Sequence, residues 1–368
     1  MNYVCAMCSQ KFSLQSNKWK CNCGGLLHLE YAKKPLDFAV TAISRNHSLW
    51  KYIDALPFSQ EDSWQQVTLG EGDTPLIAVD KNLYAKADYY MPTLSFKDRG
   101  AVTLIAMAKK LGVNRVVADS SGNAGTAIAA YSARAGIACD VFVPASTSDK
   151  KIKQIEAHGA TIHKIPGTRE ATAQAAIDMV QDTNLFYASH IYNPLFWEGT
   201  KTYFYEVFEQ CNGILPDAFV IPVGNGTLLL GAHIAFKELL AWGLIDKLPK
   251  ILAVQAENCS PILKAFREGK STVDAVENTG TLAEGIAIAA PARGAEILAA
   301  VRETGGDIIG VSEEGIMAAR QKMAAQGIYV EITSAANYAG YLNFIKKYPE
   351  LQKQTVVLPL CGAGIKSN

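Results

Sequence analysis

The sequence predicts an α/β protein in which two doubly wound domains follow a small cysteine-rich N-terminal segment. Three observations support this prediction. With 368 residues, of which 49% are hydrophobic, the chain is too long for one ordinary core and apolar enough to bury two. Strand and helix patterns alternate from Asp98 onward. The alternation comes in two series, which indicates two sheets with helices on both faces.

The individual elements follow from the position of the apolar runs. In the first series we expect helices at 100–111, 123–135, 150–157 and 169–180, and strands at 115–118, 139–143, 161–165 and 185–188. In the second series we expect strands at 218–222, 251–255, 308–311 and 355–360, and helices at 228–241, 292–303, 312–325 and 334–347. This spacing is typical of βαβ units, and it predicts a ligand in the cleft between the two domains.

The composition limits the classes of partner. Lys+Arg and Asp+Glu number 35 each, so the net charge is zero, which argues against nucleic acid or an anionic membrane as a partner. No apolar run is long enough to span a bilayer, and the N-terminus lacks the pattern of a signal peptide. We therefore expect a cytoplasmic protein that acts on a small molecule. We also expect a homodimer.

The cysteines fall into two sets. Cys5, Cys8, Cys21 and Cys23 form a C-x2-C pair and a C-x-C pair, and the other four are scattered through the chain. Paired cysteines on two tight turns suit tetrahedral zinc, with four thiolates closing the shell, so the site would be structural rather than catalytic. Gly24 and Gly25 permit the positive φ that such a turn needs. The alternative is four unrelated thiols in a reduced compartment.

Three further segments place reactive or anion-binding groups at the start of helices. Ser95-Phe96-Lys97-Asp98-Arg99-Gly100 puts a lysine between an extended segment and an apolar helix, where solubility alone does not explain it. Ser120-Ser121-Gly122-Asn123 and Gly224-Asn225-Gly226-Thr227-Leu228 each follow a predicted strand and open a helix. Backbone N–H groups that converge at such a helix start favour a bound anion.

In this order, the three segments resemble the fold-type-II pyridoxal-phosphate (PLP) enzymes, the group of threonine synthase, serine/threonine dehydratase and cysteine synthase. The resemblance runs from about Gly70 to the C-terminus. It implies PLP fold type II, with the smaller domain inserted into the larger. The expected domains are a zinc ribbon at 1–31, a large PLP-binding domain at 32–91 and 194–368, and a small inserted α/β domain at 92–193.

The resemblance also implies a role for each motif residue. Lys97 would hold PLP covalently and later move the Cα proton of the substrate, which suits a lysine because its pKa falls readily in an apolar site. The cofactor would further contact Asn123, Gly224, Asn225, Gly226, Thr227, Leu228 and Cys361, the last of these facing the pyridine nitrogen. The substrate carboxylate would contact Ser120, Ser121 and Gly122. For Cys361 the alternative is a buried core thiol.

The ribbon and the lysine motif both favour a threonine synthase, which converts O-phosphohomoserine and water to threonine and phosphate. One departure matters. Many threonine synthases read N-P-x-R-x-E-G-Q-K-T, and the arginine helps to bind the substrate phosphate. This chain reads Asn193-Pro194-Leu195-Phe196-Trp197-Glu198-Gly199, so Phe196, a candidate substrate-binding residue, stands in the arginine's place. An aromatic side chain there favours a less charged substrate.

Three hypotheses about function therefore remain. The main prediction is a threonine synthase-like, PLP-dependent carbon–oxygen lyase of amino-acid metabolism, acting on an amino acid. The second is a β-eliminating ammonia-lyase of the serine/threonine dehydratase type. The segment Ala283-Glu284-Gly285 resembles the Ala-Asp-Gly motif common in those dehydratases. The third is a PLP-binding protein without catalytic activity, and the intact Lys97 and phosphate segment argue against it.

Overall fold

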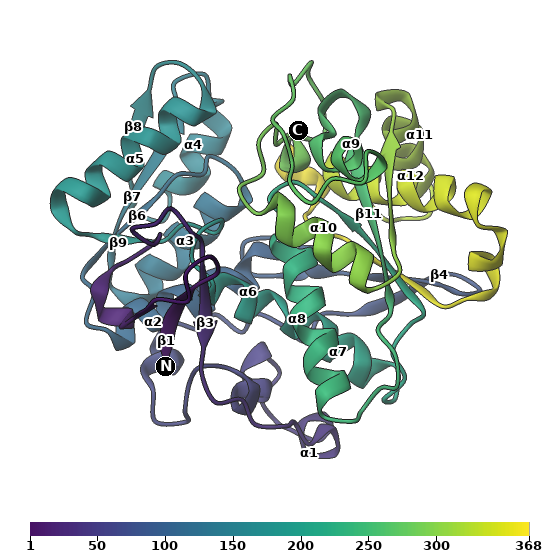
Figure 1. Ribbon diagram of the computed structural model, residues 1–368, viewed down its shortest axis with the longest axis horizontal. Helices are drawn as coiled ribbons and strands as arrows, with labels where there is room; N and C mark the ends of the chain where they lie inside the picture. The colour runs from purple at the N-terminus through teal and green to yellow at the C-terminus, as the bar shows by residue number, and fades with distance from the viewer. Residues whose placement is uncertain (368) are drawn as a thin grey trace. The chain divides into compact units, whose positions relative to one another are not determined.

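The computed structural model describes residues 1–367, and these residues divide into two units. Unit 1 consists of Met1–Glu71 and Lys97–Thr200, and unit 2 of Gly72–Phe96 and the described residues from Lys201 onward. Each unit contains its own parallel or largely parallel sheet with helices beside it (Figure 1). Among the described residues, no helix combines the length and the apolar character that crossing a membrane requires.

Unit 1 begins with a small antiparallel sheet, and the four N-terminal cysteines lie on its first strand and in its loops. Its strand order is β2-β1-β3, with β1 at Asn2–Cys5, β2 at Lys11–Phe12 and β3 at Leu27–Glu30. The short 3₁₀ helix η1 (Leu14–Ser16) follows β2. The chain then forms α1 (Phe38–Ala42), η2 (Leu49–Ala55) and η3 (Ser63–Gln66). Asp37 caps α1 by accepting a hydrogen bond of 3.0 Å from the backbone N–H of Ala39.

The larger sheet of unit 1 is parallel throughout, with the order β8-β7-β6-β9. Its strands are β6 (Arg115–Ala118), β7 (Ala138–Pro144), β8 (Thr161–Ile165) and β9 (Phe186–Tyr187). The helices of this part are α2 (Lys97–Lys110), α3 (Asn123–Ala135), α4 (Asp149–Glu156), α5 (Arg169–Thr183) and α6 (Leu195–Thr200). The face covered by α5 holds a core of Val117, Phe142, Ala176, Val180 and Tyr187.

The sheet of unit 2 has six strands in the order β12-β11-β10-β13-β5-β4. They are β4 (Leu76–Asp80), β5 (Leu83–Lys86), β10 (Ala218–Pro222), β11 (Lys250–Ala256), β12 (Asp307–Val311) and β13 (Val356–Pro359). All pairs are parallel except β4 with β5. Only Lys81 and Asn82 join these two strands, and a two-residue connection can only produce an antiparallel pair.

The helices of unit 2 accompany its sheet or lie beside its ends. The α-helices are α7 (Thr202–Gln210), α8 (Thr227–Ala241), α9 (Pro261–Arg267), α10 (Gly294–Glu303), α11 (Glu313–Ala324) and α12 (Ile332–Lys347). The 3₁₀ segments are η4 (Asp88–Tyr90), η5 (Glu257–Cys259), η6 (Glu284–Ile286), η7 (Pro349–Lys353) and η8 (Gly364–Ser367). The core under α12 is apolar and includes Val254, Val311, Phe344 and Leu358, all nearly or fully buried.

The predicted α/β class and the two doubly wound sheets are confirmed, with several local differences. Helix α2 begins at Lys97 rather than at residue 100, so the motif lysine is itself the first helical residue. The β4–β5 hairpin and the helices α1, α6, α7 and α9 were not predicted. The sheet of unit 2 is consequently mixed rather than parallel, because β4 forms an antiparallel edge.

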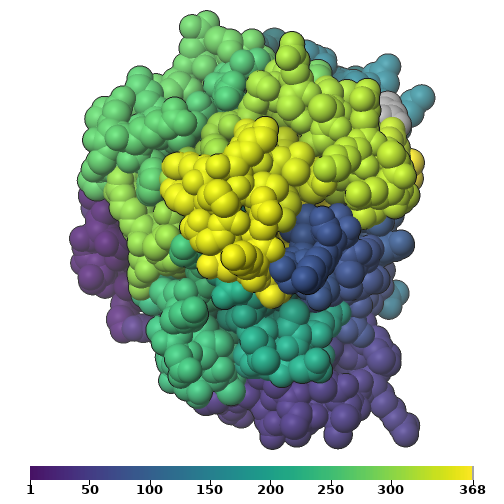
Figure 2. All heavy atoms as spheres, turned by 90° about the vertical axis from the view of Figure 1, so that its right-hand side faces the viewer, coloured from purple at the N-terminus to yellow at the C-terminus, as the bar shows by residue number. Residues whose placement is uncertain are grey.

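Unit 2 contains a cavity of about 530 Å³, lined by residues of β4, β5 and the segments around 210–216 and 355. Figure 2 shows these parts of unit 2 side by side, the β4–β5 segment in blue, the segment that contains α7 in teal and the residues near 350 in yellow. A second cavity of about 380 Å³ lies between α11 and α12. Neither lining, as far as the structure describes the chain, includes a residue that the sequence predicts for the cofactor or substrate.

Candidate active site

Lys97 stands at the point where the chain leaves unit 2 and starts α2 in unit 1. Its predecessor, Phe96, donates its backbone N–H to the carbonyl oxygen of Cys361 at 2.9 Å, and Ser95 forms an isolated bridge with Gly362. Leu94, two residues before Phe96, adopts a φ of 60°, a conformation that is uncommon outside glycine. The backbone before Lys97 is therefore fixed to the segment that follows β13.

Phe196 is the predicted site residue that the structure brings next to Lys97. The Lys97 Nζ lies 5.8 Å from the centroid of the Phe196 ring, within cation–π range. Phe196 is completely buried, and a Cβ added to Gly100 would overlap the ring carbon Cδ1. The glycine of the lysine motif therefore provides the space that the ring fills. Close packing of α2 against α6 depends on this pair.

His190 lies near the same lysine and contacts Phe196, with 5.9 Å between the two ring centroids. Burial, together with the charges of Lys97 and Arg169, lowers the pKa of His190 well below its usual 6.5. The imidazole is therefore neutral at neutral pH. A neutral imidazole can accept or donate a hydrogen bond without adding a third positive charge beside Lys97 and Arg169.

The segment Ser120–Asn123 forms the turn between β6 and α3, as the sequence predicts for an anion site. Asn123 is the first residue of α3, and Gly122 is its N-cap without a side-chain hydrogen bond to the helix start. Gly125 allows the turn to close, because a Cβ there would overlap the carbonyl oxygen of Ser120. The first N–H groups of α3 and the Ser121 hydroxyl can thus serve a carboxylate.

The segment Gly224–Leu228 has a similar place in unit 2, in the turn between strand β10 and helix α8. Gly226 is the N-cap of the 15-residue helix α8 and has a φ of 77°, which a residue with a side chain rarely adopts. A Cβ at Gly224 would lie 2.8 Å from Ile288 Cγ1. Thr227 begins the helix, and the N-cap offers no side chain to its first N–H groups. A helix start of this kind fits the phosphate of a cofactor such as PLP.

Cys361 lies after β13 and is buried, so its position fits either of the two roles expected for it. Its backbone N–H donates to the Ser334 hydroxyl at 2.8 Å, near the start of α12. The Ser334 hydroxyl also accepts from the N–H of Gly362 at 3.4 Å. The serine therefore organises the backbone on both sides of the Cys361–Gly362 bond.

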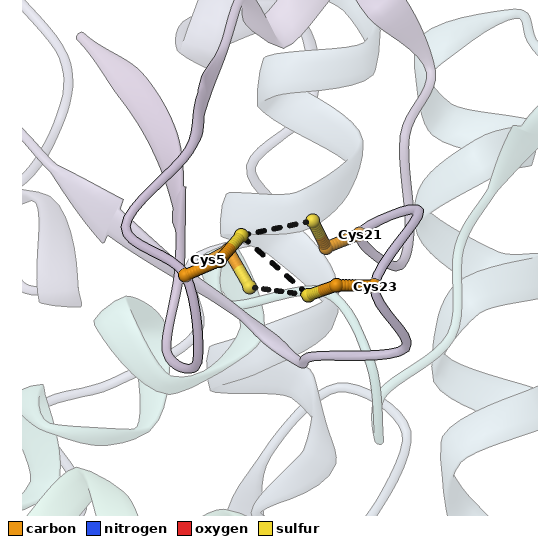
Figure 3. Close-up of side chains that lie close together, drawn as sticks. Cys5, Cys21 and Cys23 are labelled. Atoms are coloured by element: carbon orange, nitrogen blue, oxygen red, sulfur yellow. Dashed lines mark hydrogen bonds between the residues drawn. The ribbon is translucent and has the colours of Figure 1, made fainter.

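The four N-terminal cysteines converge. Figure 3 shows the side chains of Cys5, Cys21 and Cys23 pointing toward one another, and all four sulfur atoms lie within 4.8 Å of one another. The Sγ–Sγ distances are 3.5 Å for Cys5 and Cys23, 3.5 Å for Cys8 and Cys23, and 3.6 Å for Cys8 and Cys21. The backbone N–H of Cys8, first among several hydrogen bonds, helps to lower the pKa of the Cys5 thiol to about 6. A thiol with a lowered pKa readily supplies a thiolate ligand. For Cys8, the backbone N–H of Gln10 lowers the pKa, but the contacts with the other three thiols outweigh it and raise the pKa to about 12.

The sequence did not single out two buried acidic residues, Asp119 and Glu71. Asp119 directly precedes Ser120, and burial raises the pKa of its carboxyl while the Arg169 charge opposes that rise. An acidic residue at the end of the apolar run Val116-Val117-Ala118 was a visible signal for it. Glu71 is fully buried and accepts hydrogen bonds from Trp50 Nε1 at 2.8 Å and from the Tyr131 hydroxyl at 3.0 Å.

Comparison with known proteins identifies the family of this chain. Residues 67–362 match the family of pyridoxal-phosphate dependent enzymes. The threonine synthase of Methanosarcina acetivorans is 34% identical, over 98% of this chain and 91% of the relative. The threonine synthase of Methanocaldococcus jannaschii is 32% identical, over 98% of this chain and 92% of the relative. Both alignments extend well beyond the PLP family match.

A solved structure confirms the fold. The crystal structure of a threonine deaminase from T.th. superimposes with a TM-score of 0.64 and 26% identity, over 76% of this chain and 87% of that one. The PLP fold type II expected from the motifs is therefore confirmed, and PLP is the cofactor of the family. The chain belongs to the family of pyridoxal-phosphate dependent enzymes, and within it this protein is a threonine synthase-like lyase.

Proposed function

We propose that this protein is a threonine synthase, which converts O-phosphohomoserine and water to threonine and phosphate. One observation carries the proposal: two threonine synthases are 34% and 32% identical to this chain over 98% of its length. Both alignments cover more of the chain than residues 67–362, which match the PLP-dependent family. A chain that shares only the cofactor domain with these enzymes would not align over that length.

The proposed roles follow the chemistry of the side chains. PLP, when bound, withdraws electrons from the bonds at the substrate Cα. The Lys97 amine anchors the cofactor and moves protons at the substrate carbons, so that phosphate leaves from Cγ and water adds at Cβ. The turn Ser120–Gly122 and the N-terminus of α3 bind the substrate carboxylate. Asn123 would hold the cofactor at its ring oxygen, and Cys361 would lie beside its ring nitrogen.

The proposed phosphate site of the cofactor is Gly224, Asn225, Gly226, Thr227 and Leu228. The fit rests on the N-terminus of α8, where the N-cap offers no side chain to the first N–H groups, and on the positive φ of Gly226. Thr227 adds a hydroxyl next to those N–H groups. Replacing Gly226 with alanine should weaken cofactor binding, because a Cβ would lie 2.5 Å from Ile297 Cδ1 and the φ would be strained.

A serine/threonine ammonia-lyase is the second candidate, and Phe196 favours it. The ring occupies the position where an arginine helps many threonine synthases to bind phosphate, and it is completely buried. Each charged hydrogen bond that the phosphate lacks is worth about 1.5–3 kcal/mol. The two candidates share Lys97 and differ in the leaving group, so product analysis separates them.

The test compares O-phosphohomoserine, L-threonine and L-serine with the purified protein, scoring phosphate and 2-oxo acid release in parallel. Phosphate release with the first substrate alone supports the synthase. Release of 2-oxo acid from threonine or serine, without phosphate chemistry, refutes it and supports the lyase. Under the lyase hypothesis, Phe196→Arg should raise kcat/KM for O-phosphohomoserine relative to threonine by about tenfold or more. Phe196→Met is the uncharged control, and circular dichroism checks that both variants fold.

We also propose that Cys5, Cys8, Cys21 and Cys23 bind one structural zinc ion. The Sγ–Sγ distances of 3.5 Å and 3.6 Å are close to the ~3.8 Å between ligands of a tetrahedral zinc thiolate site. They are far longer than the ~2.05 Å of a disulfide bond. Metal analysis of protein produced with zinc should give one zinc per chain, and Cys23→Ser should lower that content. Two disulfides, or zinc-free protein, would refute this assignment.

The remaining predictions belong to the same proposal. The domain boundaries at residues 31, 91 and 193, a homodimer and a cytoplasmic location are all expected for such an enzyme of amino-acid metabolism. Light scattering of the purified protein tests the homodimer directly. A monomer at the concentrations used for the activity assay would refute it.

A further inference from the structure

The cysteine-rich segment packs against the large sheet of unit 1 through Trp19. The Trp19 ring centroid lies 5.7 Å from that of Tyr187 and 5.0 Å from that of Tyr192, both in edge-on geometry. Asn17 adds a hydrogen bond of 2.8 Å from its Nδ2 to the carbonyl oxygen of Asn184. Trp19 stands two residues before Cys21, so the cysteine cluster and this contact share one short segment.

Tyr187 connects this contact to the substrate turn. It ends β9 and pairs with Val117 of β6 in parallel register, and the N–H of Ala188 donates to the Val117 carbonyl at 2.8 Å. Side chains two residues apart along an extended chain share a face, so Asp119 lies on the same side as Val117. Burial and then the Asp119 charge raise the pKa of Tyr187, as expected for neighbouring groups. Ser120 follows directly.

Tyr192 connects the same contact to Phe196. It lies in a tight turn in which the N–H of Asn193 donates to the Ser189 carbonyl at 3.1 Å. The Asn193 Oδ1 in turn accepts from the N–H of Leu195 at 3.1 Å and so caps the start of α6. Phe196 is the second residue of that helix. Trp19 therefore contacts the segment that leads to Phe196 directly, and it reaches the turn at Ser120 through Tyr187.

We propose that Trp19 is a positioning residue, through which the metal-bound cysteine-rich segment holds the turns 119–123 and 188–196 in their working conformation. The proposal rests on the proposed roles of these turns and of the zinc site. A segment of about 30 residues is too small to form a stable core alone, and metal binding supplies that rigidity. Loss of the metal then frees Trp19. Tyr187 and Tyr192 lose a packing partner, and the two turns connected to them loosen.

Hydrogen exchange with mass spectrometry on the full-length, cofactor-loaded protein tests this inference independently of activity. In Trp19→Ala, amides in peptides that cover 117–124 and 186–196 should exchange about fivefold faster or more, while peptides from α10, α11 and α12 keep their rates. Trp19→Phe should restore most of the protection. Lys20→Ala, at the exposed neighbouring position, is the matched control and should exchange as the wild type does.

Two further measurements complete the test. Zinc content should stay at the wild-type level in Trp19→Ala. Removing the metal from the wild type should speed exchange in the same two peptides, whereas removing it from Trp19→Ala should speed their exchange little further. With the substrate that the wild type uses, KM should rise several-fold in Trp19→Ala while the absorbance of the bound cofactor is retained. Unchanged exchange in Trp19→Ala, or an equal change in Lys20→Ala, overturns the inference whatever the activity. If the wild type turns over none of the substrates, the hydrogen-exchange comparison alone decides whether Trp19 positions the two turns.

Discussion

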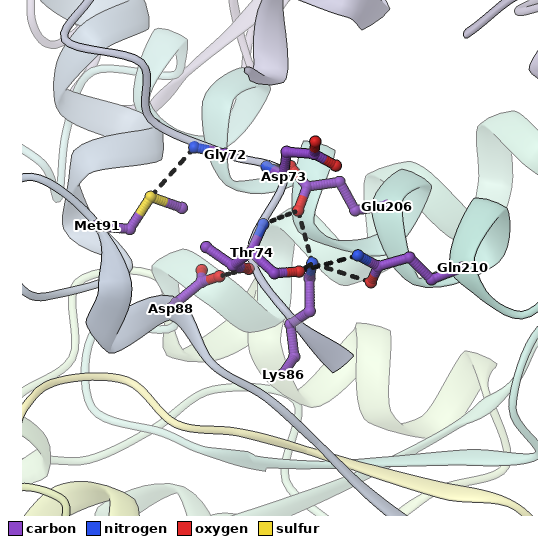
Figure 4. Close-up of polar contacts among 8 residues, drawn as sticks. All are labelled: Gly72, Asp73, Thr74, Lys86, Asp88, Met91, Glu206 and Gln210. Atoms are coloured by element: carbon purple, nitrogen blue, oxygen red, sulfur yellow. Dashed lines mark hydrogen bonds and ion pairs between the residues drawn. The ribbon is translucent and has the colours of Figure 1, made fainter. Parts of the chain in front are cut away.

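The buried ion pair Lys86–Glu206 should contribute strongly to the stability of unit 2. Lys86 Nζ lies 2.7 Å from Glu206 Oε2, and both side chains are completely buried. Lys86 also donates to Gln210 Oε1 at 3.0 Å, and Glu206 accepts from the backbone N–H groups of Asp73 at 2.9 Å and Thr74 at 3.3 Å (Figure 4). The pair therefore fixes the turn before β4 to α7.

The contacts set the size of the expected effect. Removing one partner of a buried ion pair leaves a buried charge and costs about 3–5 kcal/mol in the free energy of unfolding. The loss of unfolding free energy in Lys86→Met should be near the lower end of this range, about 3 kcal/mol, because two backbone N–H groups still donate to the Glu206 carboxylate. Glu206→Gln should cost a similar amount, since an amide oxygen still accepts but the ammonium loses its counter-charge. The double variant should also lose only about 3 kcal/mol, because its second substitution removes a charge that is already unpaired.

Native-state hydrogen exchange, measured on peptides from β5 and α7, reports these losses without requiring the two units to unfold together. Lys237→Met, which removes an exposed ion pair with Glu303 on the same unit, is the control and should cost less than about 1 kcal/mol. Single-variant losses below about 1 kcal/mol, or a double variant that loses the full sum of the two, would refute this account of the pair.

Three other predictions follow from the site. Lys97→Ala should abolish turnover and the visible absorbance of the bound cofactor while circular dichroism stays unchanged; normal kcat would rule out its role. Gly100→Ala should destabilise the protein by about 1–3 kcal/mol in urea unfolding, because the added Cβ meets the Phe196 ring, and a neutral effect would contradict that packing. The pKa of His190 lies well below 6.5 in the folded state, so as the pH falls the unfolded state binds the proton first. The free energy of unfolding should therefore fall as the pH drops below 6.5, by at most ~1.4 kcal/mol per pH unit. His190→Asn should remove that part of the pH dependence, and identical pH profiles would count against it.

Much of the fold was predictable because apolar periodicity is local. The strands at 115–118, 161–165 and 218–222 and the helix at 123–135 have the predicted bounds, since each is an apolar run between clear turn residues. The helix α7 was missed because its continuous aromatic run, Tyr203-Phe204-Tyr205, has no helical period and is buried on every side. The β4–β5 hairpin was missed because its strands are short and Asp80-Lys81-Asn82 interrupts the apolar pattern.

The site divides in the same way. The sequence alone located the motif lysine, the two turns predicted to bind anions and the cysteine cluster, because each is a short run whose chemistry depends on neighbours in the chain. Only the tertiary structure decided that Phe196 fills the space beside Gly100, that Trp19 meets Tyr187, and that Lys86 pairs with Glu206. The two partners of each contact lie far apart in the sequence. Their contacts depend on how strands and helices pack, and no local pattern of residues encodes that packing.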